Sequence, residues 1–220
     1  MAASTPGPPP IERGEALDGL LGALQAADQL RAMTVVRQAM KRGWTADDVR
    51  FHLITPALHE IGARWQRKEI GVGDEHVATS ICEWLLFALT GRARRQPATG
   101  LRALVGCSEG ELHSLGARIV AHVLSEQGWS VLFLGATTPT SAWPQIVRAR
   151  RPDVAVLTTT TPTILEEVGP ALHAIKASRP ECRTVVGGQA YLDLGGAAAD
   201  LGADLVALEA GTLARQLQEP

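Results

Sequence analysis

A histidine flanked by a carboxylate and a glycine is the group of residues best suited to chemistry. The run Glu111-Leu-His113-Ser-Leu-Gly116 directly follows an apolar stretch with the pattern of a β-strand. In an open α/β sheet, such a loop lies at the carboxyl ends of the strands, where ligands bind. A neutral imidazole there can bind a metal through one ring nitrogen, while a carboxylate holds the other. His113 is therefore a candidate metal ligand oriented by Glu111. The alternative is a solvated histidine, or one that caps the following helix.

The second half of the chain alternates apolar segments with helical ones. This alternation predicts a doubly wound parallel sheet of the α/β class. The near-continuous hydrophobicity of the strands is typical of burial on both faces. We expect strands at residues 101–105, 131–134, 154–157, 184–186 and 204–208. We expect helices at residues 112–127, 141–150 and 164–178, a short one after 188, and one at the C-terminal end.

Small and polar residues follow three of these predicted strands. They are the loop that carries His113, the segment Thr158–Thr161, and Gly187-Gly188. Because parallel strands end at one edge of the sheet, we expect these segments to meet there. Hydroxyls can satisfy a buried polar ligand, and glycines permit close backbone approach. The threonines could equally be only the end of a strand.

The first half of the chain has the periodicity of helices. Leucines at positions 17, 20, 21 and 24 repeat at i, i+3, i+4 and i+7, and a second helix is expected from Asp28 to Lys41. Thr45 and Asp48 have the spacing of a capping box, and Pro56 predicts a kink in the helix that they open. Asp74 is expected to cap a helix from Glu75 to about residue 95.

The order of these segments predicts the domain organisation. Residues 1–12 are small and proline-rich, which indicates a disordered leader. Short connections between the helices favour an antiparallel four-helix bundle over residues 13–95. A basic segment with proline and glycine, residues 91–100, is expected to be a linker, and the sheet domain is expected to span residues 101–220.

Composition narrows the class of protein. Hydrophobic residues make up 45% and charged residues 20% of the 220, which is typical of a soluble globular protein. The net charge of -2 gives no bulk positive charge for a nucleic-acid surface. No apolar run is long enough to span a bilayer, and the N-terminus lacks a signal peptide, so we expect a cytoplasmic protein. Cys82, Cys107 and Cys182 form no metal or disulfide pattern and are expected to be buried.

The segment around His113 resembles the first motif of the cobalamin-binding Rossmann-like domain, a flavodoxin-like fold. Members of this family carry Asp-x-His-x-x-Gly, and here Glu111 stands for the aspartate while His113 and Gly116 keep the other two positions. The resemblance implies that His113 binds the cobalt of cobalamin from below and displaces the dimethylbenzimidazole tail.

The other two segments resemble the remaining motifs of the same family, Ser-x-Leu and Gly-Gly. Thr158 and Thr160 occupy the Ser and Leu positions, so the second motif is degraded, while Gly187-Gly188 keep the third. The resemblance implies a channel for the nucleotide tail, lined by the two threonine hydroxyls and by the backbone of the two glycines.

The helical half resembles the cap of cobalamin-dependent, light-sensing regulators of the MerR type. Trp65 is followed ten residues later by Glu75-His76. In that family these residues surround the upper ligand, usually 5′-deoxyadenosyl. Without the resemblance, Trp65 would be read as a core aromatic, Glu75 as a first-turn carboxylate that favours the helix dipole, and His76 as exposed.

The resemblance implies a non-enzymatic cobalamin sensor that responds to light. Adenosylcobalamin or another alkylcobalamin would lose its upper ligand, and the protein would change its homo-oligomeric state or its binding to a regulatory partner. Such regulators carry a DNA-binding domain, whereas a short leader precedes the helices here, so we expect no direct nucleic-acid binding and no membrane association.

Alternatives remain open from the sequence. One is a photoreceptor that also binds a bilin such as biliverdin. Another is a corrinoid methyl carrier of a methyltransferase system, although Trp65, Glu75 and His76 suit an occupied upper face better than an open one. A mutase small subunit would leave the helical cap unexplained. A flavodoxin-like domain without a cofactor is the fourth alternative.

Overall fold

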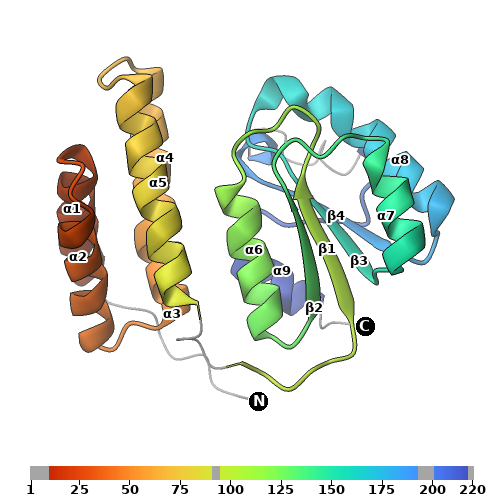
Figure 1. The fold of residues 1–220 in the computed structure, drawn as a ribbon, viewed down its shortest axis with the longest axis horizontal. Coiled ribbons are helices and arrows are strands. Elements are labelled where there is room, and N and C mark those ends of the chain that lie inside the picture. The colour runs from red at the N-terminus through yellow and green to blue at the C-terminus, as the bar shows by residue number, and fades with distance from the viewer. Residues whose placement is uncertain (1–9, 91–94, 193–200, 218–220) are drawn as a thin grey trace. The chain divides into compact units, whose positions relative to one another are not determined.

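The computed structural model describes residues 10–90, 95–192 and 201–217. The chain divides into two compact units, Met1–Ala93 and Arg94–Pro220. The first is helical and the second contains the sheet, and each is described by itself below (Figure 1). The fold is therefore of the mixed α/β class, with a helical N-terminal region and a parallel sheet, as the sequence predicts.

The helical unit is built from helices that pack through leucine, isoleucine and alanine side chains. α1 packs on α2, α4 on α5, and α5 also contacts α1 and α2. Buried residues from four of the helices, among them Leu20, Val36, Ile61 and Leu85, fill the interior. The bounds are α1 (Pro10–Gln25), α2 (Gln29–Lys41), α3 (Ala46–Val49), the π-helix η1 (Arg50–Ile54), α4 (Thr55–Gln66) and α5 (Val72–Leu89).

Local sequence explains where several of these helices begin and bend. The Asp48 N–H donates to Thr45 Oγ1 at 3.0 Å and the Thr45 N–H to Asp48 Oδ2 at 2.8 Å, which confirms the predicted capping box. Pro56 has no N–H to donate. The turn before Pro56 widens into η1, where the Thr55 N–H reaches back five residues to Arg50 O.

In the helical unit, the first residues of α1 and α5 differ from the sequence prediction. α1 begins at Pro10, so residues 10–12 of the expected leader are helical, because proline is tolerated in the first turn. The remaining leader residues lie outside the described part of the chain. α5 begins at Val72 instead of Glu75, because Asp74 caps from inside the first turn, where its Oδ2 accepts the Gly71 N–H at 2.9 Å.

Five described strands of the second unit form one parallel sheet in the order β2-β1-β3-β4-β5. The strands are β1 (Arg102–Cys107), β2 (Ser130–Gly135), β3 (Val154–Thr158), β4 (Arg183–Gly187) and β5 (Leu205–Val206). The helices are α6 (Leu115–Glu126), α7 (Ala142–Arg150), η2 (Pro162–Glu167), α8 (Val168–Ser178), η3 (Gln189–Tyr191) and α9 (Ala210–Gln216). Part of the predicted short helix after residue 188 falls in residues 193–200, outside the described ones.

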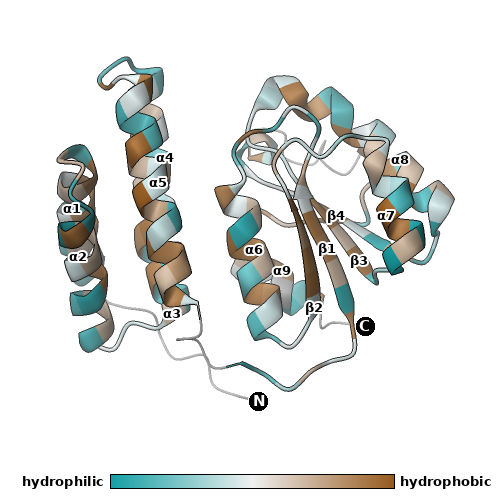
Figure 2. Ribbon diagram, viewed as in Figure 1, coloured by the Kyte–Doolittle hydropathy of each residue, from teal (hydrophilic) through white to brown (hydrophobic). Residues whose placement is uncertain are grey.

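Helices cover both faces of this sheet. α6 and α9 lie on one face, α7 and α8 on the other (Figure 1). The strands between them are strongly hydrophobic (Figure 2), and a core of buried side chains that includes Leu104, Trp143, Leu157 and Val186 fills the α7–α8 side. Since β2 and β3 flank β1, the strand order reverses beside β1, and ligands bind at such a switch point.

The loop after β1 is longer than the sequence predicts. α6 begins at Leu115, not at Leu112, because the His113 N–H donates to the Glu111 side chain instead of entering the helix. His113 therefore lies on a loop at the carboxyl edge of the sheet. No helix within the described residues has the length and apolar character needed to cross a membrane.

Candidate functional site

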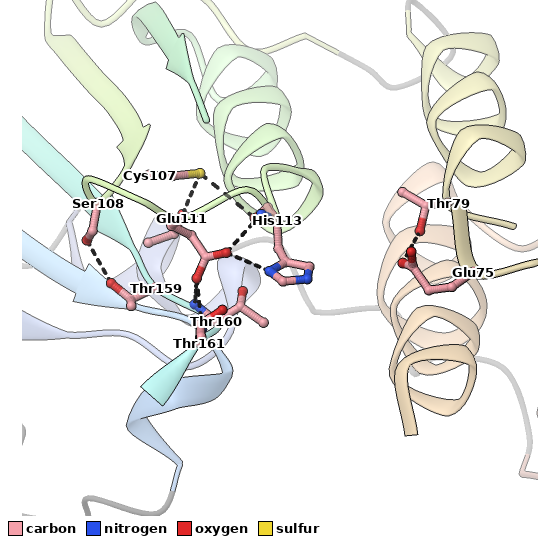
Figure 3. Close-up of polar contacts among 10 residues, drawn as sticks. Glu75, Thr79, Cys107, Ser108, Glu111, His113, Thr159, Thr160 and Thr161 are labelled. Carbon is pink, nitrogen blue, oxygen red and sulfur yellow. Dashed lines mark hydrogen bonds and ion pairs between the residues drawn. The ribbon is translucent and has the colours of Figure 1, made fainter. Parts of the chain in front are cut away.

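The loop between β1 and α6 holds the His113 ring by a carboxylate. Glu111 Oε1 lies 2.6 Å from His113 Nδ1 and accepts the His113 N–H at 2.8 Å (Figure 3). The Glu111 side chain is fully buried, whereas 54% of the His113 side chain is exposed. The carboxylate fixes the ring orientation and engages Nδ1, so Nε2 lies on the side of the ring away from Glu111.

The second oxygen of Glu111 reaches a different strand end. Oε2 accepts the backbone N–H groups of Thr160 at 2.7 Å and Thr161 at 2.8 Å (Figure 3). Burial raises the pKa of this carboxyl, but the hydrogen bonds from His113 and from the two threonine amides outweigh burial and lower the pKa to about 2. Glu111 is therefore an anion near neutral pH, joined to two loops.

A row of small side chains crosses the strand ends on the α6 side of the sheet. Cys107 pairs with Thr158 and Thr158 with Gly187 in register, so all three point to the same face. The Thr158 hydroxyl donates to Cys107 Sγ at 3.4 Å. The predicted residues Thr158 and Gly187 are thus neighbours. Cys107, which is buried as the sequence predicts, lies beside Thr158.

Buried hydroxyls on the neighbouring positions tie the same strand ends together. Ser108 Oγ lies 2.7 Å from Thr159 Oγ1, which lies 3.3 Å from the Tyr191 hydroxyl. Burial raises the pKa of Tyr191 to about 12, so its hydroxyl stays protonated. Sequence reasoning missed these contacts, although the run of hydroxyl residues after two strands was a usable signal.

The predicted glycines differ in what requires them. A Cβ on Gly187 would lie 2.2 Å from Ala207 O, and one on Gly188 2.4 Å from Thr159 O; Gly188 also has a φ of +113°. Close packing of the chain therefore accounts for both residues. A Cβ on Gly116 would meet no atom within 4 Å. Neither local packing nor backbone conformation demands this glycine, which leaves space beside the His113 loop.

The helical unit carries a second carboxylate-held imidazole. Glu75 Oε2 lies 2.6 Å from His76 Nδ1, and Glu75 Oε1 accepts the Thr79 hydroxyl at 2.8 Å. Figure 3 shows the Glu75–Thr79 contact on α5. Thr79 was not predicted from the sequence, although its position one turn after Glu75 is a signal.

Trp65 lies at the same end of the helical unit, in the last turn of α4, and is 44% exposed. A tight turn joins it to α5, and ion pairs brace that turn: Arg64 with Glu60 at 2.7 Å and Arg67 with Glu69 at 2.6 Å. The structure therefore gathers Trp65, Glu75 and His76 at one end of two adjacent helices. An exposed indole at this position is not a core aromatic.

Comparison with protein families identifies both units. A family model described as a B12 binding domain matches residues 101–217, and a second model with the same description matches residues 16–90. The chain belongs to the B12-binding family. It carries a cobalamin-binding domain whose carboxyl-edge loops are those described above.

Relatives with similar sequences include a transcriptional repressor and an uncharacterized protein. The HTH-type transcriptional repressor CarA of Myxococcus xanthus is 30% identical over 196 residues, which is 86% of this chain and 64% of CarA. The chain thus spans less than two thirds of that relative's length. An uncharacterized 20.5 kDa protein of Rhodobacter capsulatus is 29% identical over 73% of this chain and 85% of its own.

A solved structure shares the whole fold. The Methanosarcina barkeri monomethylamine corrinoid protein superposes with a TM-score of 0.78 at 18% identity, over 94% of this chain and 99% of its own. At this identity the likeness shows the fold alone.

The donor set of the sheet unit fits a corrinoid. One oriented imidazole supplies one axial ligand, which suits a metal whose other ligands come from a macrocycle. Cys107, Thr158 and Gly187 are small residues at the strand ends of the same edge of the sheet, and a Cβ on Gly116, at the start of α6, would meet no atom within 4 Å. His113 is the residue that would hold cobalt, through Nε2.

Proposed function

We propose that this chain is a cobalamin-binding sensory protein in which a change at the upper ligand alters oligomeric state or partner binding. The arrangement that carries the proposal is the exposed Trp65 beside the clamped Glu75–His76 pair, in a chain related to CarA over both units. An indole and an oriented imidazole suit recognition of an organic upper ligand, and a buried tryptophan would not.

On the lower side, we propose that His113 is the axial ligand and that Glu111 orients it. The nucleotide tail of the cofactor would run along the Thr158 and Thr160 segment and the Gly187-Gly188 backbone. The open space at Gly116 and the small row that includes Thr158 and Gly187 support this assignment. Glycine and threonine there exclude little volume and offer hydroxyls and amides to a polar tail.

In the helical unit, we propose that Trp65, Glu75 and His76 contact the upper ligand. A bound alkylcobalamin such as adenosylcobalamin supplies a cobalt–carbon bond that light cleaves. Trp65 gains or loses a packing partner when that ligand leaves, and the braced turn from Arg64 to Glu69 passes the change to α4 and α5. A two-state change of this kind needs only different contacts in the two states.

Absorption spectroscopy of dark-purified protein tests the proposal. The protein is loaded with adenosylcobalamin, and spectra are recorded before and after green and then red illumination. We expect corrin bands that convert under green light to those of a cobalamin without its alkyl ligand. Failure to take up cobalamin would overturn the proposal. A far-red band would show that a bilin is also bound.

The shared fold of the Methanosarcina barkeri monomethylamine corrinoid protein favours a second candidate, a corrinoid methyl carrier. A carrier must leave the upper face open to a methyltransferase, so Trp65 and His76 would contribute little to binding. Equal affinity for methylcobalamin and adenosylcobalamin, with no change on illumination beyond loss of the alkyl group, would favour the carrier over the sensor.

A further inference from the structure

The amino edge of the sheet carries exposed arginines that the proposed function does not use. They come from the end of α7 and from the starts of β1 and β4, and we call them the arginine surface: Arg102, Arg148, Arg150, Arg151 and Arg183. The His113 loop lies at the other end of β1. Because β1 has six residues, about 20 Å separate its two ends. The arginine surface is therefore distinct from the site around His113.

Hydrogen bonds hold the elements that carry these arginines side by side. Arg102 Nη1 donates to Arg150 O at 3.2 Å, which joins the start of β1 to the last turn of α7 (Figure 1). Asp153 Oδ2 accepts the Arg102 N–H at 2.7 Å, and Asp153 O accepts the Arg183 N–H at 2.9 Å. β1, α7 and β4 thus meet at the segment before β3, and their arginines form one continuous surface.

The carboxylates of this region do not neutralise the arginine surface. Glu181 pairs with Arg179 at 3.1 Å, and Asp204 pairs with Lys176. Asp153 uses one oxygen for a backbone N–H. No guanidinium of the arginine surface pairs with a carboxylate in the part of the chain that the structure describes. The surface therefore keeps an excess of positive charge.

Stability of the fold explains only part of this charge. Arg148 and Arg150 lie in the last turn of α7, where a cation interacts favourably with the helix dipole. Arg102 and Arg183 begin strands, where this reason does not apply. Arg151 has a φ of 49°, a left-handed conformation at a helix end that glycine adopts most readily. Local stability therefore does not favour an arginine at that position.

The chemistry of the surface fits phosphate groups. The planar guanidinium donates two parallel hydrogen bonds to a phosphate, and arginine is the side chain best suited to that contact. Interfaces with proteins have an apolar centre, whereas Leu101, 38% exposed, is the large apolar side chain exposed beside Arg102. Several guanidiniums without such a centre favour a polyanion over a protein.

We propose that the arginine surface binds the phosphate backbone of a nucleic acid without reading its base sequence. The net charge of -2, from which the sequence predicts no nucleic-acid binding, is an average over the chain and does not describe this edge. α7 and α8 present their C-terminal ends here, so no helix N-terminus is available to enter a groove. The inference does not depend on the proposed function, because it involves the opposite edge of the sheet.

Titration of a fluorescent DNA duplex of mixed sequence with the full chain tests this inference. Fluorescence anisotropy is recorded at several salt concentrations. We expect a dissociation constant of about 10⁻⁶–10⁻⁴ M at physiological salt. The logarithm of the affinity should fall with the logarithm of the salt concentration by about 0.9 per phosphate contact, so three to five arginines give a slope of about -2.7 to -4.5. Absence of binding at low salt would overturn the inference.

Two variants test which residues make the contacts. The side chains of Arg150 and Arg183 make no hydrogen bond or ion pair with the described part of the chain, so Arg150→Gln and Arg183→Gln should keep the fold. Each is expected to make the salt slope shallower by about one. Arg37→Gln removes the same charge from an exposed position on α2 and should leave the slope unchanged. An equal effect of all three would show general attraction by charge and would refute the arginine surface.

Two other polyanions distinguish the kind of partner. Vesicles of phosphatidylserine and phosphatidylcholine represent an anionic membrane, and poly-glutamate represents an acidic protein. We expect both to bind more weakly than the duplex at equal charge. Binding to either one without binding to the duplex would assign the surface to that class of partner and overturn the inference. Failure to take up cobalamin would overturn the proposed function alone.

Discussion

His113 and His76 are each held at Nδ1 by a carboxylate that lies one or two residues earlier in the chain. This contact orients each ring through Nδ1. The two pairs differ in burial: Glu111 is fully buried, whereas Glu75 is partly exposed and is anchored by Thr79. The fully buried Glu111 gives the His113 ring the more rigid support, which suits a metal ligand.

Replacement of His113 tests that role. His113→Ala is expected to weaken cobalamin binding about tenfold or more, because the axial bond is lost, and to convert the spectrum from the histidine-ligated to the base-off or water-ligated form. Titration followed by absorbance measures both. His173→Ala, at an exposed position on α8, is the control and is expected to change neither. An unchanged spectrum in His113→Ala would remove this residue from the site.

Gly116 offers a test of where the cofactor lies. Gly116→Ala is expected to stabilise the fold by up to about 1 kcal/mol, since alanine favours a helix and its Cβ meets no atom, yet to weaken cobalamin binding. Gly169→Ala in α8 is matched, because its Cβ also meets no atom. Gly169→Ala is expected to stabilise the fold without a loss of affinity for cobalamin. Equal cobalamin affinity in the two variants would contradict placement of the cofactor beside Gly116.

Trp65 and Trp84 form a natural pair of variants in the helical unit, 44% and 37% exposed. Trp65→Ala is expected to leave cobalamin binding largely intact but to reduce the preference for adenosylcobalamin over hydroxocobalamin, because the proposed function places the indole against the upper ligand. Trp84→Ala is expected to keep the preference. The ratio of the two dissociation constants is the measurement, and an unchanged ratio in Trp65→Ala would refute the assignment of the cap.

At the scale of elements, β5 is a two-residue strand and depends on side-chain contacts at its start. Asp204 Oδ2 accepts the Thr184 N–H at 2.6 Å and the Thr184 hydroxyl at 2.9 Å, and it pairs with Lys176. Burial raises the pKa of Asp204, but the hydrogen bonds from Lys176 and Thr184 outweigh burial, so the pKa lies below its ordinary 3.8. The ionised form therefore stabilises the attachment of β5 to β4.

Asp204→Asn is expected to lower the free energy of unfolding by about 1–2 kcal/mol at pH 7, through loss of charged hydrogen bonds. A lowered pKa contributes stability above the unfolded-state pKa and loses it as the pH falls through the folded-state value. The difference in the free energy of unfolding between Asp204→Asn and the wild type should therefore become smaller below about pH 4. Urea denaturation at several pH values measures it, with Glu166→Gln, at an exposed position, as the control. A difference in the free energy of unfolding that grows as the pH falls would contradict this account.

Hydrophobic periodicity was sufficient to predict the helices and strands but not the residues at which they begin and end. Alternating apolar strands and helices led to the parallel sheet, and Thr45 with Asp48 predicted a helix start. η1 was missed because Pro56 can kink a helix or widen the turn before it, and tertiary packing decides between the two. α6 begins late because a side chain competes for the His113 N–H.

The candidate site could be predicted only as far as side-chain types reveal it. The motif residues His113, Thr158 and Gly187 do lie at one edge of the sheet. The contacts of Glu111 with Thr160 and Thr161 could not be predicted, because backbone N–H groups carry no sequence signature and lie 49 and 50 residues away. The sequence predicts a role for the Thr160 hydroxyl, whereas in the structure the Thr160 backbone N–H donates to Glu111.

At the scale of the whole molecule, the helical unit presents apolar side chains that a monomer rarely exposes together. Val77, Trp84 and Phe87 lie on the exposed side of α5, with Phe87 75% exposed. Trp84 follows Val77 by seven residues and Phe87 follows Trp84 by three, and this spacing places them on one face of the helix. Surfaces of this kind mark interaction sites. A change in α4 and α5 that starts at Trp65 would therefore act on a surface suited to association.

Light is therefore expected to change the assembly of the cobalamin-loaded protein. Size-exclusion chromatography with light scattering, run in the dark and after green illumination, should give different masses, because in the proposed function loss of the upper ligand changes the packing of Trp65 and, through it, α5. Protein loaded with hydroxocobalamin, which has no alkyl group to lose, is the control and should give one mass in both conditions. Trp65→Ala should reduce the shift. Identical dark and light masses, with photolysis verified by absorbance and no change in binding to a partner, would argue against a sensor and for a methyl carrier.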